Sequence, residues 1–192
     1  MPLNIPILLT WLRIVLIPLM IAIYYVPESW VHFVGRDLAA TVVFVVAAVT
    51  DWLDGYLARR WRQTSAFGAF LDPVADKLMV AAALIVLVQL GRLEAILAAI
   101  IIGREITISA LREWMAQIGA HRSVAVSMIG KIKTTAQMVA IPLLLYHSPL
   151  RGLDVSMAGT WLIYVAAVLT LWSMGYYMRM AWPHLIEEDR RR

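Results

Sequence analysis

From residue 51 the chain reads Asp51-x-x-Asp54-Gly55-x-x-Ala58-Arg59, then eight residues, then Gly68-x-x-x-Asp72-x-x-x-Asp76. Because an α-helix turns by about 100° per residue, the first half of this stretch places its acidic and small residues on one helix face. The second half does the same on the next helix. The short connection between them lets the two faces oppose each other. The stretch therefore predicts two neighbouring helices that present paired carboxylates beside small residues.

The composition places these helices in a membrane. The chain has 192 residues, of which 61% are hydrophobic and 16% charged, and its mean hydropathy is +0.74. Soluble domains average about 45–50% apolar and about 25% charged residues. Since a helix crosses a bilayer with roughly 20 apolar residues, we predict an all-α integral membrane protein with a single domain, residues 1–192. Its six predicted transmembrane helices are 5–26, 38–60, 68–90, 93–114, 124–147 and 155–178.

Basic residues sort the predicted loops into two sets. The loops after the second and fourth spans and the C-terminal tail contain Arg59, Arg60, Arg62, Arg122, Arg179 and Arg190 to Arg192, with Lys131 and Lys133 near the same side. The other loops contain only Arg36, Arg92 and Arg151. The positive-inside rule then predicts that both termini and the aspartates are cytoplasmic. The basic tail is typical of a surface that contacts anionic lipid, and nothing indicates a nucleic-acid partner.

The four aspartates suit a divalent metal. Hard oxygen ligands favour Mg²⁺ or Mn²⁺, and two such ions balance four carboxylates. Paired ions commonly stabilise the attacking and leaving oxygens of a phosphoryl displacement. Arg59 can pair with a phosphate. The alternative is that the aspartates pair with Arg59, Arg60 or Lys77 and serve helix packing alone.

Every fixed position of this stretch matches the signature of the CDP-alcohol phosphatidyltransferases, which the chain resembles. The resemblance implies a six-helix membrane fold, a homodimer, and displacement of CMP by an acceptor hydroxyl. It implies a dimetal site made by Asp51, Asp54, Asp72 and Asp76, with Asp76 also the general base. The residues that it implies contact the CDP group are Asp54, Gly55, Ala58, Arg59 and Gly68.

Further segments resemble bacterial inner-membrane members that join CDP-diacylglycerol to sn-glycerol 3-phosphate. They are Asn4-Ile5-Pro6, Leu9-Thr10, Arg13-Ile14, Gly103-Arg104-Glu105-Ile106, Ser109 to Trp114 and Gly130-Lys131-x-Lys133-Thr134. The acceptor's phosphate needs basic residues, and the candidates are Arg104, Arg112, Lys131 and Lys133. Arg104 is equally suited to pair with Glu105, and two lysines two positions apart share a pocket only if the helix is irregular. Asn4, Thr10 and Arg13 are expected to approach the site from the first span.

Three other functions remain open from the sequence. The same chemistry can serve another acceptor alcohol, such as serine or inositol phosphate. An aspartate-rich membrane prenyltransferase also binds a diphosphate through Mg²⁺, although it lacks the Gly-x-x-Ala-Arg segment. An ion transporter can place acids in a membrane, but these four lie toward one end of their spans.

Overall fold

The structure, a computed structural model, describes residues 5–27, 29–30, 32–61, 66–118, 128–149 and 152–191. The side chains of residues 5, 6, 33, 58, 59, 66, 67, 69, 128–131 and 184–191 lie outside that description. The described ranges contain helices and turns and no β-strand, which confirms the predicted all-α fold. The helices are α1 (Ile5–Ile23), α2 (Phe33–Trp61), α3 (Ala66–Gln89), α4 (Ala95–Gln117), α5 (Met128–Tyr146) and α6 (Val155–Arg191).

Two helices are longer than the sequence predicted. Helix α2 begins at Phe33, whereas the prediction began at 38, and α6 continues to Arg191, whereas the prediction ended at 178. Both predictions stopped at a charged residue, because apolarity was the criterion. A helix ends at a cap or a breaker and not at a charge, and Pro183 is accommodated inside α6.

Two helices are long and apolar enough to cross a membrane by length and composition. They are residues Val34–Leu57 of α2 and Val155–Pro183 of α6. Ile7–Ile23 of α1 and Ile132–Tyr146 of α5 form shorter apolar helices. Helices α3 and α4 carry charged residues within their lengths, among them Asp72, Asp76, Arg104 and Glu105.

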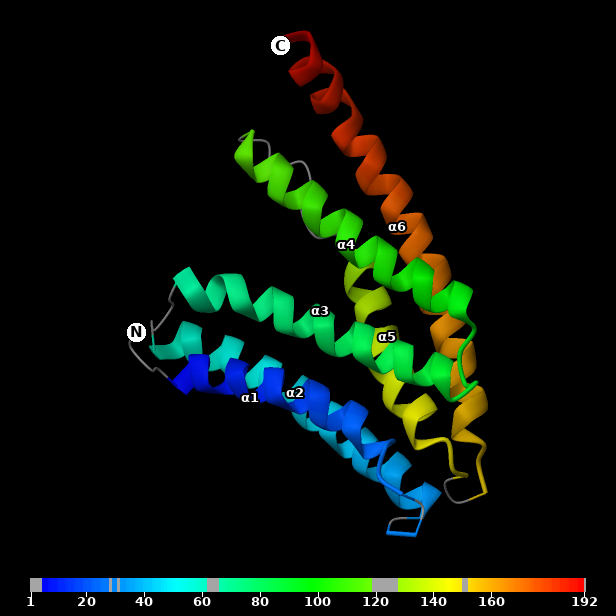
Figure 1. The fold of residues 1–192 in the computed structure, drawn as a ribbon. Coiled ribbons are helices and arrows are strands. Elements are labelled where there is room, and N and C mark those ends of the chain that lie inside the picture. Colours follow the sequence, from blue (N-terminus) through cyan, green and yellow to red (C-terminus); the bar gives the residue numbers. More distant parts are fainter. Residues whose placement is uncertain are drawn as a thin grey trace.

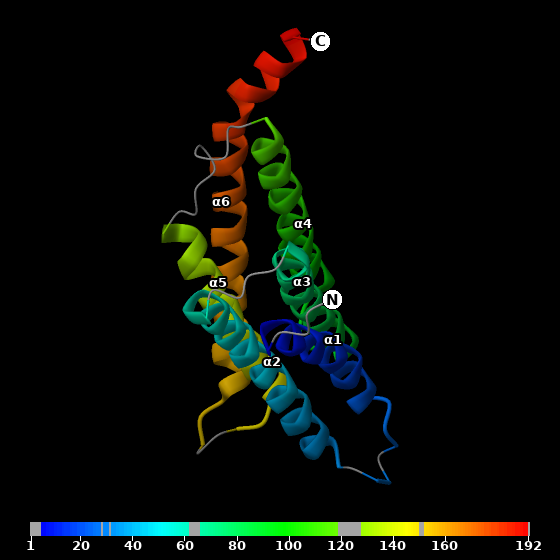
Figure 2. The same cartoon turned by 90° about the vertical axis from the view of Figure 1, so that its left-hand side faces the viewer.

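The helices form an antiparallel bundle that opens at one end (Figure 1). Helix α1 packs against α2 and α3, while α4 packs against α6. Helix α5 contacts both groups, through α2 and α3 on one side and α6 on the other. Figure 1 shows α3 and α4 diverging toward the end that holds the N-terminus, and Figure 2 shows α5 and α6 beside α2 and α4. The start of α3 and the end of α2 lie at this open end.

Small residues let the helices approach closely. Ala40, Ala47, Ala83, Ala140 and Ala166 are fully buried. Helices in lipid associate through close packing and polar contacts, because the lipid chains are as apolar as the side chains. Large apolar side chains such as those of Val42, Val49 and Val168 lie on the outside. This inside-out distribution agrees with a bundle surrounded by lipid.

A buried ion pair joins the helices at the end far from the motif. Arg92 Nη2 lies 2.7 Å from Asp37 Oδ2, and both side chains are nearly inaccessible. Arg92 Nη1 also donates to the backbone carbonyl of Leu145 at 2.7 Å, near the end of α5. Asp37 precedes Asp51 by roughly 20 Å along α2, at 1.5 Å per residue. Compensation by Arg92 explains why α2 includes Asp37, which the span prediction left outside.

Candidate active site

Arg13 of α1 holds the two motif carboxylates of α2. Its side chain is 1% exposed, and Nη1 donates to Asp51 Oδ1 at 2.5 Å. Nη2 donates to Oδ2 of Asp54, whose side chain is also buried. A buried guanidinium is stable only when charged partners replace its lost water. The positive charge at this position therefore depends on the two aspartates, and the ionised aspartates depend on it.

The two motif carboxylates of α3 face the same stretch of α1. Asp72 Oδ1 accepts a hydrogen bond of 2.6 Å from Thr10 Oγ1. Asp76 lines a small cavity together with Arg13 and Asp51. Thr10 and Arg13 are three residues apart and so lie on one face of α1. All four aspartates of the motif thus converge on this face, which agrees with the predicted approach of Thr10 and Arg13; Asn4, the third residue of that prediction, lies outside the described residues.

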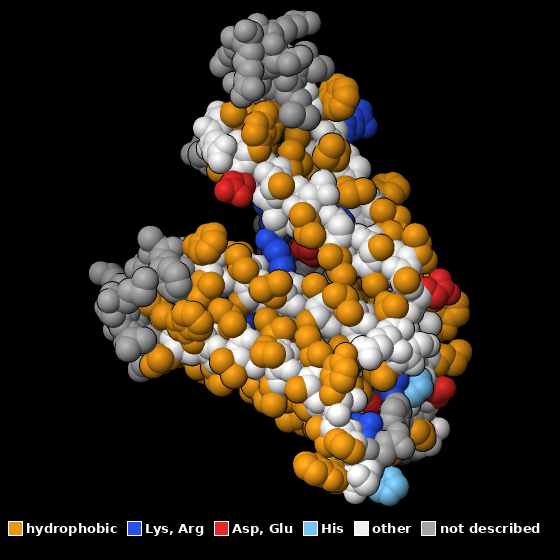
Figure 3. All heavy atoms as spheres, viewed as in Figure 1, with side chains coloured by type: hydrophobic (Ala, Val, Ile, Leu, Met, Phe, Trp, Pro, Cys, Tyr) orange, Lys and Arg blue, Asp and Glu red, His pale blue; other side chains and the backbone are white. Residues whose placement is uncertain are grey.

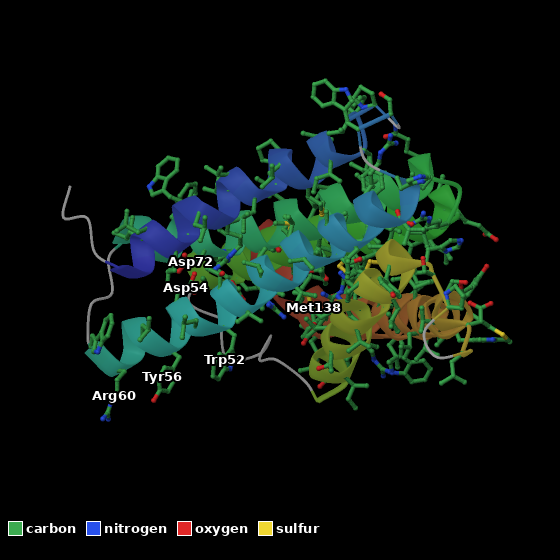
Figure 4. All side chains as sticks on the ribbon, turned by 90° about the horizontal axis from the view of Figure 1, so that it is seen from below. Trp52, Asp54, Tyr56, Arg60, Asp72 and Met138 are labelled. Carbon is green, nitrogen blue, oxygen red and sulfur yellow. The ribbon has the colours of Figure 1, made fainter. Side chains whose placement is uncertain are left out.

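The outward side of α2 looks different from the inward side. Figure 4 shows Asp54 and Asp72 pointing toward each other between α1, α2 and α3, while Trp52, Tyr56 and Arg60 point away. Asp54 is 3% exposed, whereas Trp52 is 68% exposed. The alternative was that the aspartates pair with Arg59, Arg60 or Lys77. In the described residues Asp51 and Asp54 pair with Arg13 instead, while the side chain of Arg59 lies outside the description.

The donor set has the chemistry of a site for hard divalent cations. Four carboxylates from two helices approach one another, and Thr10 and Arg13 border them. Oxygen ligands of this kind select Mg²⁺ or Mn²⁺ over softer metals. In the described part of the chain, however, no three acidic, histidine or cysteine side chains are arranged as a ready metal cage. The guanidinium of Arg13 holds the α2 pair instead.

Two of the residues predicted to contact CDP, Gly55 and Gly68, are close in sequence to these carboxylates. Gly55 directly follows Asp54, and Gly68, which is buried, lies one turn before Asp72 on α3. The side chains of Ala58 and Arg59 lie outside the described residues. Glycines leave the backbone open to a close-lying ligand.

A second polar cluster joins α4 and α5. Glu105 accepts from Arg104 Nη1 at 3.4 Å and from the ammonium group of Lys133. Arg104 is 6% exposed and Lys133 only 1%. The structure thus brings together two of the predicted acceptor residues through one carboxylate, and it shows the Arg104–Glu105 pair that the sequence left open. The side chain of Lys131 lies outside the described residues.

Helix α6 completes the second cluster with residues that the sequence analysis missed. Arg104 Nη2 donates to Ser173 Oγ at 2.9 Å. The buried ring of Tyr177 lies 5.8 Å from the Arg104 guanidinium and 5.6 Å from that of Arg112. Cation–π attraction to one ring holds the two like charges near each other. Ser173 and Tyr177 are four residues apart in an apolar helix, and this polar stripe was the available signal.

The two clusters lie close together, beside a crevice between α3 and α4. Lys77, which directly follows Asp76 on α3, and Glu105 of α4 both border this crevice. The crevice is lined by Lys77, Glu105 and apolar residues of both helices. Figure 3 shows a hollow where the helices diverge, with basic and acidic side chains at its bottom. A ligand with an apolar part and an anionic part matches such walls.

A helical bundle with paired aspartates on two adjacent helices defines the class of protein. The chain belongs to the CDP-alcohol phosphatidyltransferase family, whose model matches residues 3–172.

Proteins similar to this chain include enzymes of Escherichia coli and Shigella. The chain is 52% identical over 190 residues to the CDP-diacylglycerol–glycerol-3-phosphate 3-phosphatidyltransferase of Escherichia coli (strain K12). That comparison covers 98% of this chain and 100% of the relative. The proteins of the same name from Shigella sonnei (strain Ss046) and Shigella flexneri serotype 5b (strain 8401) are 52% and 51% identical over the same shares of both chains.

Proposed function

We propose that this chain transfers the phosphatidyl group of CDP-diacylglycerol to sn-glycerol 3-phosphate, releasing phosphatidylglycerophosphate and CMP. Relatives that carry this activity in their name match the chain over nearly its whole length. The observation that carries the proposal is the convergence of Asp51, Asp54, Asp72 and Asp76 on one face of α1. Four acids gathered at one end of a bundle suit a diphosphate substrate.

The proposed chemistry is a displacement at phosphorus. Asp76 takes the proton from the C1 hydroxyl of sn-glycerol 3-phosphate. The hydroxyl oxygen then forms a bond to the phosphorus that carries diacylglycerol. The bond from this phosphorus to the oxygen of CMP breaks, CMP leaves with the electron pair, and Asp76 returns its proton to water.

The four carboxylates are proposed to bind two Mg²⁺ or Mn²⁺ ions, which when bound neutralise the diphosphate and stabilise the leaving CMP. Gly55, Ala58, Arg59 and Gly68, together with Asp54, are proposed to contact the CDP group. The donor chemistry described above and the spacing of the motif support this assignment.

The acceptor's phosphate is proposed to bind beside Arg104, Arg112, Lys131 and Lys133. Support comes from the burial of Arg104 and Lys133, which share one carboxylate, Glu105. Buried cations in excess of acids favour an anionic ligand. Glu105 lines the crevice between α3 and α4 together with Lys77, the residue after Asp76, and this supports an acceptor pocket beside the proposed base.

The proposal includes the membrane arrangement. The chain forms one domain with six membrane-spanning helices in the bacterial inner membrane, both termini and the active site are cytoplasmic, and two copies form a homodimer. The cytoplasmic interface lets the acyl chains stay in lipid while CDP and glycerol phosphate come from water. The distribution of basic residues supports this orientation.

An ion transporter is less well supported. Between Asp37 and Asp51, α2 contains no acidic residue, and Asp37 is held by Arg92. The described acids of α2 therefore form two separate groups and not a path across the bundle.

The deciding experiment measures CMP release by the purified full-length chain with CDP-diacylglycerol and a panel of acceptors. We expect turnover with sn-glycerol 3-phosphate in the presence of Mg²⁺ or Mn²⁺, and none after chelation. Turnover with serine or inositol phosphate, while sn-glycerol 3-phosphate is inert, would overturn the proposed acceptor. Movement of Mg²⁺ into liposomes without CMP release would support the transporter.

A further inference from the structure

Arg13 occupies an unusual position for a positive charge. It lies in α1, is 1% exposed, and its two terminal nitrogens contact one carboxylate oxygen each of Asp51 and Asp54. It also borders the cavity that Asp51 and Asp76 share. Its Nε has no hydrogen-bond partner among the described residues. An arginine that only joined α1 to α2 would need one carboxylate, whereas this one reaches into the middle of the acidic cluster.

We propose that Arg13 is a built-in counter-ion that competes with divalent cations for Asp51 and Asp54, so that it weakens metal binding. This inference rests on the metal site of the proposed function. Arg13 stabilises the acidic cluster by itself, and a cation that binds the same carboxylates is repelled by the guanidinium and draws the carboxylates away from it.

The charges indicate why such a competitor is useful. Two bound divalent cations would neutralise the four carboxylates. The charge of Arg13, which contacts two of them, would then make the site positive overall. The diphosphate of the lipid substrate removes that excess. Arg13 therefore makes cation binding tighter when the diphosphate is present than when it is absent. Since affinity for two ligands is coupled reciprocally, bound cations in turn favour the diphosphate.

A merely structural role predicts something different. A packing ion pair stabilises the protein equally with and without cations. The chain offers such a pair as a control, because Arg92 and Asp37 are also buried and joined at 2.7 Å but lie at the far end of α2. Replacing Arg92 removes a buried guanidinium without touching the acidic cluster.

The experiment compares Arg13→Met and Arg13→Gln, which remove the charge, with Arg13→Lys, which keeps it, and with Arg92→Met. Each full-length protein is purified in detergent without substrate. Mn²⁺ binding is measured from the loss of the electron paramagnetic resonance signal of free Mn²⁺. The melting temperature is measured in chelator and in Mg²⁺.

We expect Mn²⁺ to bind about tenfold more tightly to the charge-removing variants, because a small part of the repulsion between neighbouring cations is enough for that factor. These variants melt lower than wild type in chelator, and Mg²⁺ raises their melting temperature by more than it raises that of wild type. Arg13→Lys binds Mn²⁺ nearly as wild type does. Arg92→Met melts lower in both conditions, with an unchanged Mg²⁺-dependent rise.

Equal or weaker Mn²⁺ binding by Arg13→Met and Arg13→Gln would overturn the inference while leaving the proposed function intact. If Arg13→Met does not fold, Arg13→Gln decides the question, since it keeps a hydrogen-bonding side chain. A wild-type protein that binds no Mn²⁺ but releases CMP in chelator would overturn both the inference and the proposed metal site.

Discussion

Asp76 differs from the other motif aspartates in what its side chain faces. Asp51 and Asp54 are held by Arg13, and Asp72 is held by Thr10. Asp76 lines the cavity, and the next residue, Lys77, lines a crevice together with Glu105. If the proposed metal site and acceptor pocket are correct, Asp76 is suitably placed to accept a proton.

Replacing Asp76 with asparagine tests this role. We expect turnover to fall by about 10²- to 10⁴-fold, the usual contribution of a general base, while binding of CDP-diacylglycerol is largely retained. CMP release and lipid binding are measured on the same preparation. Asp154→Asn is the matched control, because Asp154 is exposed and caps the start of α6 through Ser156 and Met157. Near-normal turnover of Asp76→Asn would show that another group accepts the proton.

Lys133 is the second residue whose charge can be tested directly. Lys133→Met leaves Glu105 with only its longer contact to Arg104 Nη1 at 3.4 Å, so the single variant mixes a lost ligand with a weakly compensated acid. The double variant Lys133→Met/Glu105→Gln removes both charges. We expect the KM for sn-glycerol 3-phosphate to rise in both variants, with a smaller change in kcat. A normal KM in the double variant would remove Lys133 from the acceptor pocket.

At the scale of the elements, α6 packs against the cluster formed by Arg104, Glu105 and Lys133 and contacts Arg104. Its long apolar segment, Val155–Pro183, presents Ser173 and Tyr177 to α4, where they contact Arg104. Tyr177 also faces Arg112, so one ring holds two guanidiniums. Without the ring, mutual repulsion should move the two arginines apart.

Tyr177→Leu should therefore raise the KM for sn-glycerol 3-phosphate several-fold, whereas Tyr177→Phe, which keeps the ring face, should stay near wild type. A cation–π contact of this kind contributes about 0.5–2 kcal/mol, enough for that change. The neighbouring Tyr176 is half exposed, so Tyr176→Leu is the control. Equal KM values for Tyr177→Leu and Tyr177→Phe would contradict a positioning role for the ring.

At the scale of the whole molecule, two buried ionic groups hold opposite ends of α2. One is the Arg13 cluster, which joins α1 to the motif. The other joins Asp37, Arg92 and the end of α5. Because the partners described for Arg92, Asp37 and the backbone of Leu145, lie far along α2 and α5 from the motif, the second group should serve stability.

Arg92→Met tests this division. Removing one partner of a buried ion pair costs about 3–5 kcal/mol, so the melting temperature should fall clearly. Adding Asp37→Asn removes the unpaired acid and should restore part of the loss. The KM for sn-glycerol 3-phosphate should be unchanged below the melting transition. A raised KM would mean that the far end of the bundle also positions the site.

The sequence predicted much of the fold and part of the site. In the part of the chain that the structure describes, six helices occur where apolar segments indicated them, and the two helices of the motif do lie side by side. The prediction was less successful where tertiary partners compensate a charge, as Arg92 does for Asp37 at the start of α2. Glu105 was considered only as a partner of Arg104, and its contact with Lys133 on α5 was not foreseen.

By itself, the amino-acid sequence determined two kinds of property: those that sum over residues, such as hydropathy, and those set by residues close together in the chain. Hydropathy selects lipid as the surrounding solvent, and residue spacing places the aspartates on one face of each helix. Only the tertiary structure decided which charges meet. Arg13 and Asp54 are 41 residues apart, and Arg104 and Ser173 are 69 apart. Such pairs form because a cation buried in a low-dielectric bundle is stable only beside its partner, and which partner is near depends on how all the helices pack.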